Sequence, residues 1–152
     1  MKQAIIMRGI SGAGKSTLVA ERWPDAAAVV CSDDYYPMPR CQGRLTSAEV
    51  HAAYRVCLDR WMRYVAEGAT PLVLDRQSLT WAAVRPYAAV AKARGYHVLV
   101  VTVHAELEVA AARNKHGVSL ATEAELAASM EDAGTWPTWI SLEDVMPEAH
   151  GT

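Results

Sequence analysis

The sequence predicts a three-layer α/β fold, in which a parallel sheet of four to five strands carries helices on both faces. Two observations predict it. Short apolar runs alternate along the chain with longer segments that begin at helix-capping residues. The runs are apolar almost throughout, which is typical of strands buried on both faces of a parallel sheet. No repeat or linker divides the sequence, so residues 1–152 are expected to form one domain.

The first half of the chain is expected to contain three strands and two helices. A helix over about 15–22 is stopped by Trp23-Pro24. The capping box at 46–49 predicts a long helix that ends at Gly68, since glycine takes the left-handed conformation readily. The three apolar runs that we expect to be strands cover 3–7, 28–31 and 72–74.

The second half of the chain is also expected to alternate between helices and strands. Ser78 or Thr80 is expected to cap a helix that runs to about Arg94. The β-branched run over 96–103 is the clearest strand, and a helix over about 106–114 follows it. A capping box at 122–125 predicts a helix reaching about 132, and Trp139-Ile140 is a candidate for a short last strand.

Composition narrows the class of protein. The chain has 15 Lys and Arg against 17 Asp and Glu, a formal net charge of −2. This balance argues against a protein held on nucleic acid by its overall charge, although it does not exclude a local basic groove. The three cysteines lack zinc-ligand spacing and are odd in number, which favours reduced thiols and a cytoplasmic protein. The apolar run over 4–7 is too short for a signal peptide or a membrane span.

A phosphate-binding motif lies between the first expected strand and the first expected helix. Residues 9–16 match the pattern Gly-x-x-x-x-Gly-Lys-Ser/Thr in full. Its backbone N–H groups and the start of the following helix would cradle nucleotide phosphates. Lys15 would reach the β- and γ-phosphates, Ser16 would bind Mg²⁺, and Thr17 would support the α-phosphate. The expected ATP-binding residues are therefore Gly9, Ser11, Gly12, Ala13, Gly14, Lys15, Ser16 and Thr17.

Several classes of nucleotide-binding protein fit less well than a phosphotransferase. A small GTPase would need a guanine-reading Asn/Thr-Lys-x-Asp segment, which is absent. A motor or transporter ATPase would need coupling domains that 152 residues do not accommodate, although Leu72–Asp75 resembles its acidic strand end. Phosphoryl transfer needs little more than positioning and charge stabilisation, which one small domain can supply.

Three carboxylates are expected at the carboxyl edge of the sheet, near the phosphates. Asp33 is the candidate general base for the attacking hydroxyl, and Asp34 is a candidate for orienting the acceptor. Both could instead cap a turn or a helix, as Asp often does. Asp75 ends the third strand, where it would bind the acceptor or hold Mg²⁺ through water, or serve only as a turn residue.

Cations are expected to close over the triphosphate. Arg113 and Lys115 lie in a segment of about 113–121 that is suited to a lid, and Arg113 is the better candidate because its guanidinium fork suits phosphate. A charged helix end is the alternative interpretation. Arg40 and Arg44, in a loop marked by proline and glycine, either hold an acceptor phosphate or are solvated.

Aromatic and histidine side chains give weaker indications. His51 and Tyr54 share one face of the expected long helix and are either site residues or surface residues. Trp136 and Trp139 offer surfaces on which a base could stack, but such residues more often close a core.

The pattern resembles a known family, the small P-loop kinases related to the 5′-kinase domain of bacteriophage polynucleotide kinase. The likeness covers roughly residues 2–132. The phosphate loop is shared by many enzymes, whereas the Asp-Asp-Tyr element at 33–35 and the Arg-Asn-Lys-His-Gly-Val element at 113–118 are more specific. His51, Tyr54 and the segment 72–75 also match the family.

The resemblance implies a P-loop kinase fold and transfer of the γ-phosphate of ATP, with Mg²⁺, to a hydroxyl group. It implies that Asp33 is the general base, that Asp75 is in the active site, and that Arg113 is in the lid. Two positions depart from the family. Residues 75–78 read Asp-Arg-Gln-Ser rather than Asp-Asn-Thr-Asn, and Tyr36 stands where the phage enzyme has an acceptor-gripping arginine. Acceptor binding is therefore assigned to Arg40, Arg44 or Arg76.

Three hypotheses follow. The first is a polynucleotide 5′-hydroxyl kinase, or a kinase of a hydroxyl on a nucleic-acid base. The second is a kinase for a small metabolite such as a nucleoside, sugar or antibiotic, which the net charge of −2 favours mildly. The third is a non-catalytic ATP-binding module.

Overall fold

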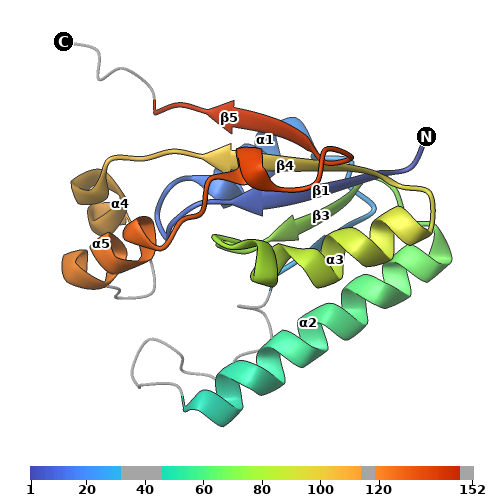
Figure 1. Ribbon diagram of the computed structural model, residues 1–152, viewed down its shortest axis with the longest axis horizontal. Coiled ribbons are helices and arrows are strands. Elements are labelled where there is room, and N and C mark those ends of the chain that lie inside the picture. Colours follow the sequence, from blue (N-terminus) through green and yellow to red (C-terminus); the bar gives the residue numbers. More distant parts are fainter. Residues whose placement is uncertain (32–45, 114–118, 148–152) are drawn as a thin grey trace.

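Parallel strands form the centre of the protein (Figure 1). The structure is a computed structural model that describes residues 1–31, 46–113 and 119–147. Within these residues the sheet has five strands in the order β2-β3-β1-β4-β5, and each neighbouring pair is parallel. This confirms the predicted parallel sheet. The strands are β1 (Gln3–Arg8), β2 (Ala28–Val30), β3 (Leu72–Asp75), β4 (His97–Val103) and β5 (Ser141–Val145).

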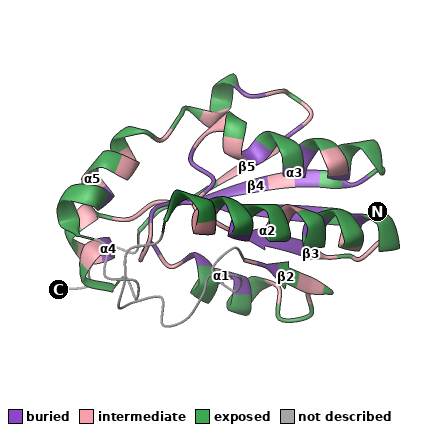
Figure 2. Cartoon of the chain, turned by 90° about the horizontal axis from the view of Figure 1, so that it is seen from below, coloured by how far each residue is buried: buried purple, intermediate pink, exposed green. Residues whose placement is uncertain are grey.

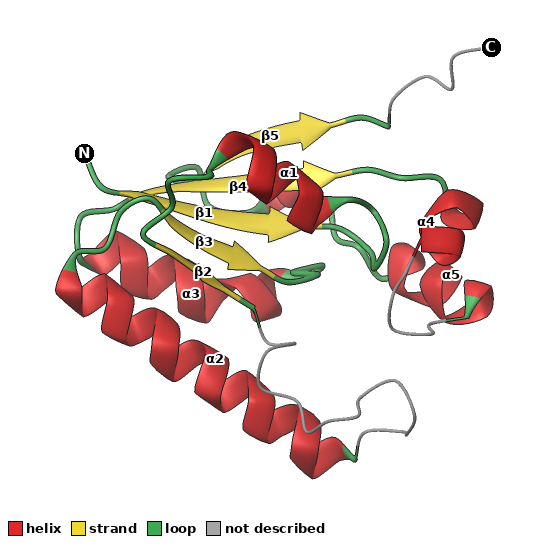
Figure 3. Cartoon of the chain, turned by 180° about the vertical axis from the view of Figure 1, so that it is seen from behind, coloured by secondary structure: helices red, strands yellow, loops and turns green. Residues whose placement is uncertain are grey.

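Helices cover both faces of the sheet, as predicted. Helix α1 (Lys15–Arg22) lies on one face, and α2 (Ser47–Glu67) and α3 (Trp81–Ala93) lie on the other (Figure 3). Two short helices, α4 (Leu107–Arg113) and α5 (Leu120–Ala128), lie together beyond the carboxyl edge of the sheet (Figure 1). A 3-10 turn, η3 (Ala133–Thr135), precedes β5. Among the described residues, no helix combines the length and apolar character that crossing a lipid bilayer requires.

The strands divide the core into two apolar clusters because successive side chains of a strand point to opposite faces. In β1, Ala4 and Ile6 pack toward α2 and α3, whereas Ile5 and Met7 pack toward α1. Trp61 of α2 is fully buried and donates from Nε1 to the Tyr87 carbonyl of α3 at 3.0 Å. Figure 2 shows the exposed outer face of α2 lying over buried strands.

Most helix boundaries agree with the sequence. Thr46 and Glu49 form the predicted capping box of α2, and Gly68 ends that helix with φ 74°. Of the two candidates for capping α3, Thr80 does so. The predicted start of α5 is wrong. Ser119 caps this helix by accepting from the Thr122 N–H, so Thr122 lies inside the first turn, and the helix ends at Ala128 rather than near 132.

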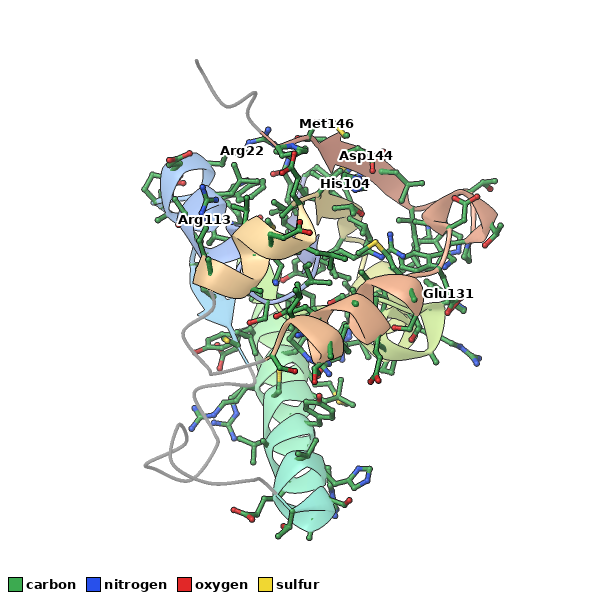
Figure 4. The ribbon with its side chains drawn as sticks, turned by 90° about the vertical axis from the view of Figure 1, so that its left-hand side faces the viewer. Arg22, His104, Arg113, Glu131, Asp144 and Met146 are labelled. Carbon is green, nitrogen blue, oxygen red and sulfur yellow. The ribbon has the colours of Figure 1, made fainter. Side chains whose placement is uncertain are left out.

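The prediction of the last strand is also wrong. Trp139 and Ile140 pack against the core, and β5 begins at Ser141, with Leu99 of β4 opposite. The strand alternates half-buried and exposed residues because it lies at the edge of the sheet, so it lacks the apolar run of the inner strands. Figure 4 shows side chains gathered around β5. Arg22 pairs with Glu143, and His104 Nε2 lies 2.8 Å from Asp144 Oδ1.

The guanidinium of Arg8, at the end of β1, joins the loops at the carboxyl edge. It is 3% exposed and lies over the Trp136 ring, 4.7 Å from its centroid. It donates to the carbonyls of Ser78 and Leu79, at 3.1 and 2.9 Å, and to the Glu131 carbonyl. One charged group therefore satisfies backbone acceptors from two separate loops.

We predict that Arg8→Met lowers the free energy of unfolding by about 3 kcal/mol, because it leaves buried carbonyl oxygens without donors. In a thermal melt the midpoint should fall by about 6–12 °C. Arg22→Met is the matched control, since it breaks an exposed ion pair and should cost less than about 1 kcal/mol. Equal melting curves for the two variants would contradict the role assigned to Arg8.

Candidate active site

The chain leaves β1 through a turn that requires glycine at its first position. Gly9 has φ 150°, and a Cβ on it would lie 2.6 Å from the carbonyl oxygen of Val103 in β4. No side chain fits there without moving backbone. Gly14 has φ 101°, but a Cβ on it would meet nothing within 4 Å. The loop is thus pressed against the sheet at Gly9 and faces open space at Gly14, where Ser11, Gly12 and Ala13 lead into α1.

The N-terminus of α1 is prepared for an anion. Gly14 is its N-cap and supplies no side-chain acceptor to the first N–H groups, and the first turn contains no acidic residue. A helix start of this kind leaves its N–H donors and the positive end of its dipole for a ligand. Ser16 and Thr17 follow in the same turn and are exposed. This geometry agrees with the phosphate-binding role predicted for residues 9–17.

Lys15 folds back into the loop. Its side chain is largely buried, and Nζ donates to the carbonyls of Gly9 and Ile10, each at 2.8 Å. The ammonium group therefore sits on the inner side of the loop that we expect to hold phosphate. A triphosphate oxygen is a stronger partner for an ammonium group than a neutral carbonyl is. The structure thus places the Lys15 ammonium group inside the loop, and its binding of the phosphates stays a prediction.

Ser16 and Asp75 meet across the end of the sheet. The Ser16 hydroxyl donates to Asp75 Oδ2 at 2.6 Å, and Asp75 is 8% exposed. The contact forms because β1 and β3 are neighbours with Met7 opposite Asp75, so β3 ends beside the phosphate loop. A hydroxyl and a carboxylate oxygen are the ligand types that Mg²⁺ prefers, and it commonly completes its shell with water and phosphate oxygens. These residue types fit the predicted Mg²⁺ site, in which Ser16 is the ligand and Asp75 either acts through water or binds the acceptor, and both roles stay predictions.

Arg76 points away from the phosphate loop, because it follows Asp75 in the chain. Its guanidinium carbon lies 4.3 Å from the ring centroid of Tyr54 in α2 and 5.2 Å from that of Tyr87 in α3. Burial raises the pKa of the Tyr87 phenol, and the positive charge of Arg76 opposes that shift. The end of β3 therefore presents a carboxylate toward α1 and a guanidinium toward α2 and α3.

The helices α4 and α5 bring two charged residues to this edge. Arg113 is the last residue of α4 and is exposed (Figure 4). Glu123 of α5 is fully buried and was not predicted as a site residue. Burial raises the pKa of its carboxyl, and the charge of Lys15 partly offsets that shift. A capping-box pattern drew attention to this segment, but only the packing of α5 reveals the position of Glu123.

Three of the other predicted site residues lie in the described part of the chain and five do not. His51 is exposed on α2, one turn before Tyr54, and no described contact joins it to the phosphate loop. Trp136 and Trp139 pack around Trp81, with ring centroids 5.6 and 6.3 Å away, so they close the core as the alternative interpretation held. Five predicted residues lie outside the described part of the chain, namely Asp33, Asp34, Arg40, Arg44 and Lys115.

Comparisons with known proteins bear on the whole domain. The model of a family described as an AAA domain (AAA_33) matches residues 5–130. No curated protein sequence matches the chain.

Solved structures share the fold at low sequence identity. A gluconokinase from Sinorhizobium meliloti 1021 superposes with a TM-score of 0.61 at 17% identity, over 94% of this chain and 82% of that one. The APS kinase CysC of Mycobacterium tuberculosis gives 0.59 at 14%, over 97% and 90%. A chain of a Pnkp1/Rnl/Hen1 complex gives 0.61 at 14%, over 74% and 38%. The protein therefore has a P-loop kinase-like fold.

We predict that alanine has different effects at the two ends of the loop, on stability at Gly9 and on ATP binding at Gly14. Gly9→Ala should lower the melting temperature, because its Cβ would collide with the backbone of β4. Gly14→Ala should leave the fold largely intact and weaken ATP binding by about tenfold, because a strained helix start misdirects the N–H donors. Melting curves and calorimetric titration with ATP and Mg²⁺ measure the two effects. Tight ATP binding by a folded Gly14→Ala variant would contradict the phosphate-loop assignment.

Proposed function

The chain belongs to the AAA_33 family of AAA domains, and we propose that it is an ATP-dependent kinase that phosphorylates a hydroxyl group, with the 5′-hydroxyl of a polynucleotide as its acceptor. The observation that carries the proposal is the junction of three elements at one edge of the sheet. There Lys15 lies inside the phosphate loop and the Ser16 hydroxyl bonds to Asp75. Positioning and charge stabilisation at such a junction are what phosphoryl transfer requires.

ATP would bind with its β- and γ-phosphates over the N-terminus of α1. Lys15 then exchanges the carbonyls of Gly9 and Ile10 for phosphate oxygens. Ser16 and Asp75 would hold Mg²⁺, which neutralises charge on the phosphates when it is bound. No large rearrangement of the sheet is needed, because these groups already converge.

The transfer step makes one bond and breaks one. The acceptor oxygen attacks the γ-phosphorus, the bond between that phosphorus and the oxygen bridging it to ADP breaks, and the acceptor proton passes to the Asp33 carboxylate. We assign Arg113 and Lys115 the role of stabilising the negative charge that develops on the transferred phosphoryl group. Asp33 and Lys115 enter this step from the sequence alone.

Arg76 supports a polynucleotide acceptor. The guanidinium is held between the rings of Tyr54 and Tyr87, and its flat fork suits a phosphate diester, while the half-exposed Tyr54 ring suits a base. We assign Asp34, Arg40, Arg44 and His51 to the same acceptor side. We assign Asp75 to the boundary between ATP and the acceptor, because it accepts a hydrogen bond from Ser16 and directly precedes Arg76.

A small-metabolite kinase is the second candidate. The net charge of −2 favours it, because a polyanion is better met by a basic surface. Two of the solved structures that share the fold, a gluconokinase and an APS kinase, support it as well.

Transfer of label from γ-labelled ATP distinguishes these candidates. We expect label to enter an oligonucleotide with a 5′-hydroxyl and not one with a 5′-phosphate. Asp33→Asn should lower the transfer rate by about 100-fold or more while ATP affinity changes little, because a general base acts on the acceptor rather than on the nucleotide. Asp59→Asn, an exposed position on α2, is the matched control.

Label found in nucleosides or sugars but in no oligonucleotide would replace the first candidate with the second. ATP binding without transfer to any acceptor would instead indicate a non-catalytic ATP-binding module. Full activity of Asp33→Asn would remove that residue from the mechanism.

A further inference from the structure

Glu123 is a buried acid that the described structure leaves unsatisfied. The residue has 0% exposure, and neither carboxyl oxygen has a hydrogen-bond partner. Leu126 and Ala127 lie one turn further along α5 on the same face, and both pack with the apolar cluster that contains Ile10 and Ala13 of the phosphate loop. The face of α5 that carries Glu123 is therefore turned toward this cluster, to which the phosphate loop contributes.

The charge that acts on Glu123 comes from that loop. Among the described residues, the ammonium group of Lys15 is the charged group that influences its ionisation. The neighbouring helix α4 presents buried Ala110, and Glu125 of α5 itself is exposed. The Glu123 carboxyl thus lies within electrostatic range of the place where Lys15 would meet the phosphates.

An ionised carboxylate in this position would oppose the proposed ligand. A buried charge without hydrogen bonds is costly, and a triphosphate brings further negative charge while it draws Lys15 to itself. A neutral carboxyl removes the repulsion and adds an O–H donor, and phosphate oxygens are strong acceptors. Burial already favours the neutral form, because it raises the pKa of Glu123.

We propose that Glu123 is a further residue of the nucleotide site, whose protonated carboxyl donates a hydrogen bond to the phosphate chain of the bound triphosphate. The proposal rests on the proposed function to the extent that ATP must bind at the loop, but it does not depend on the acceptor. ATP binding then carries a proton from solvent onto Glu123. The bound state has the higher pKa, so affinity is greatest below the pKa of the free protein and falls as the pH rises through the interval between the two values.

The experiment measures the affinity for ATP and Mg²⁺ by calorimetry between about pH 6 and about pH 8, in buffers of different ionisation enthalpy. Wild type should take up part of a proton on binding and lose several-fold in affinity over this range, relative to Glu123→Gln. The amide of that variant donates at every pH, so its binding should show only the ionisation of ATP itself. Glu125→Gln, on the exposed side of the same helix, is the matched control and should behave as wild type.

A second variant separates the hydrogen bond from the charge. Glu123→Leu suits the apolar surroundings but cannot donate, and it should bind ATP about fivefold more weakly than Glu123→Gln. Melting curves establish that each variant is folded. If one of them fails to fold, the other still serves as the reference without an ionisable group at position 123, and wild type should take up more protons on binding than it does.

Three results would overturn the inference. They are the same proton uptake in wild type and Glu123→Gln, a wild-type affinity that does not fall relative to that variant as the pH rises, and much weaker binding by Glu123→Gln at every pH. The last would mean that the carboxylate holds a cation. A failure of the proposed function gives a different result. Proton-linked ATP binding without phosphoryl transfer would contradict the proposed kinase activity and support the role proposed for Glu123. The absence of ATP binding would contradict both proposals.

Discussion

The buried guanidinium of Arg8 is the interaction on which the active-site edge depends. Parallel strands end at the same edge of the sheet, but the backbone hydrogen-bond ladder that joins the strands does not continue into the loops after them. Arg8 reinforces the connection between two of these segments, because it binds the loop after β3 at Ser78 and Leu79 and the segment after α5 at Glu131, whose N–H also donates to the Leu79 carbonyl. Gly9 follows at once and passes so close to β4 that it admits no side chain. The phosphate loop therefore starts from a point held on several sides.

The charged and polar groups around the phosphate loop determine which ligands this edge of the sheet can bind. The loop offers N–H donors and the positive end of α1, and Lys15 adds a cation that the Gly9 and Ile10 carbonyls hold in this structure. Asp75 and Ser16 place oxygen ligands on one side of the same point, and Arg76 carries positive charge toward α2 and α3. Glu123 is the exception, since it is a buried acid within electrostatic range of Lys15, in the loop that we propose holds the phosphates. Protonation of Glu123 would remove the repulsion between its carboxylate and the phosphates, and we therefore expect nucleotide binding to depend on pH.

Local signals in the sequence predicted much of this fold and part of the site. Three of these features each depend on a few adjacent residues, and the structure contains all three. They are the phosphate loop, the capping box at Thr46 and the acidic end of β3. Features that depend on distant packing were missed. The edge strand β5 lacks an apolar run, and Glu123 looks like any helix-starting glutamate until α5 packs on the loop. The roles of Asp33 and Lys115 stay predictions, because both lie outside the described residues.

The central claim is that residues 9–16 hold the phosphates of ATP and that Lys15 changes partners when they do. A crystal structure of the protein with Mg²⁺ and a non-hydrolysable ATP analogue tests this most directly. We expect β- and γ-phosphate oxygens against the N–H groups at the start of α1, with Lys15 Nζ on phosphate and no longer on the carbonyls of Gly9 and Ile10. An analogue bound elsewhere, with Lys15 still on those carbonyls, would contradict it.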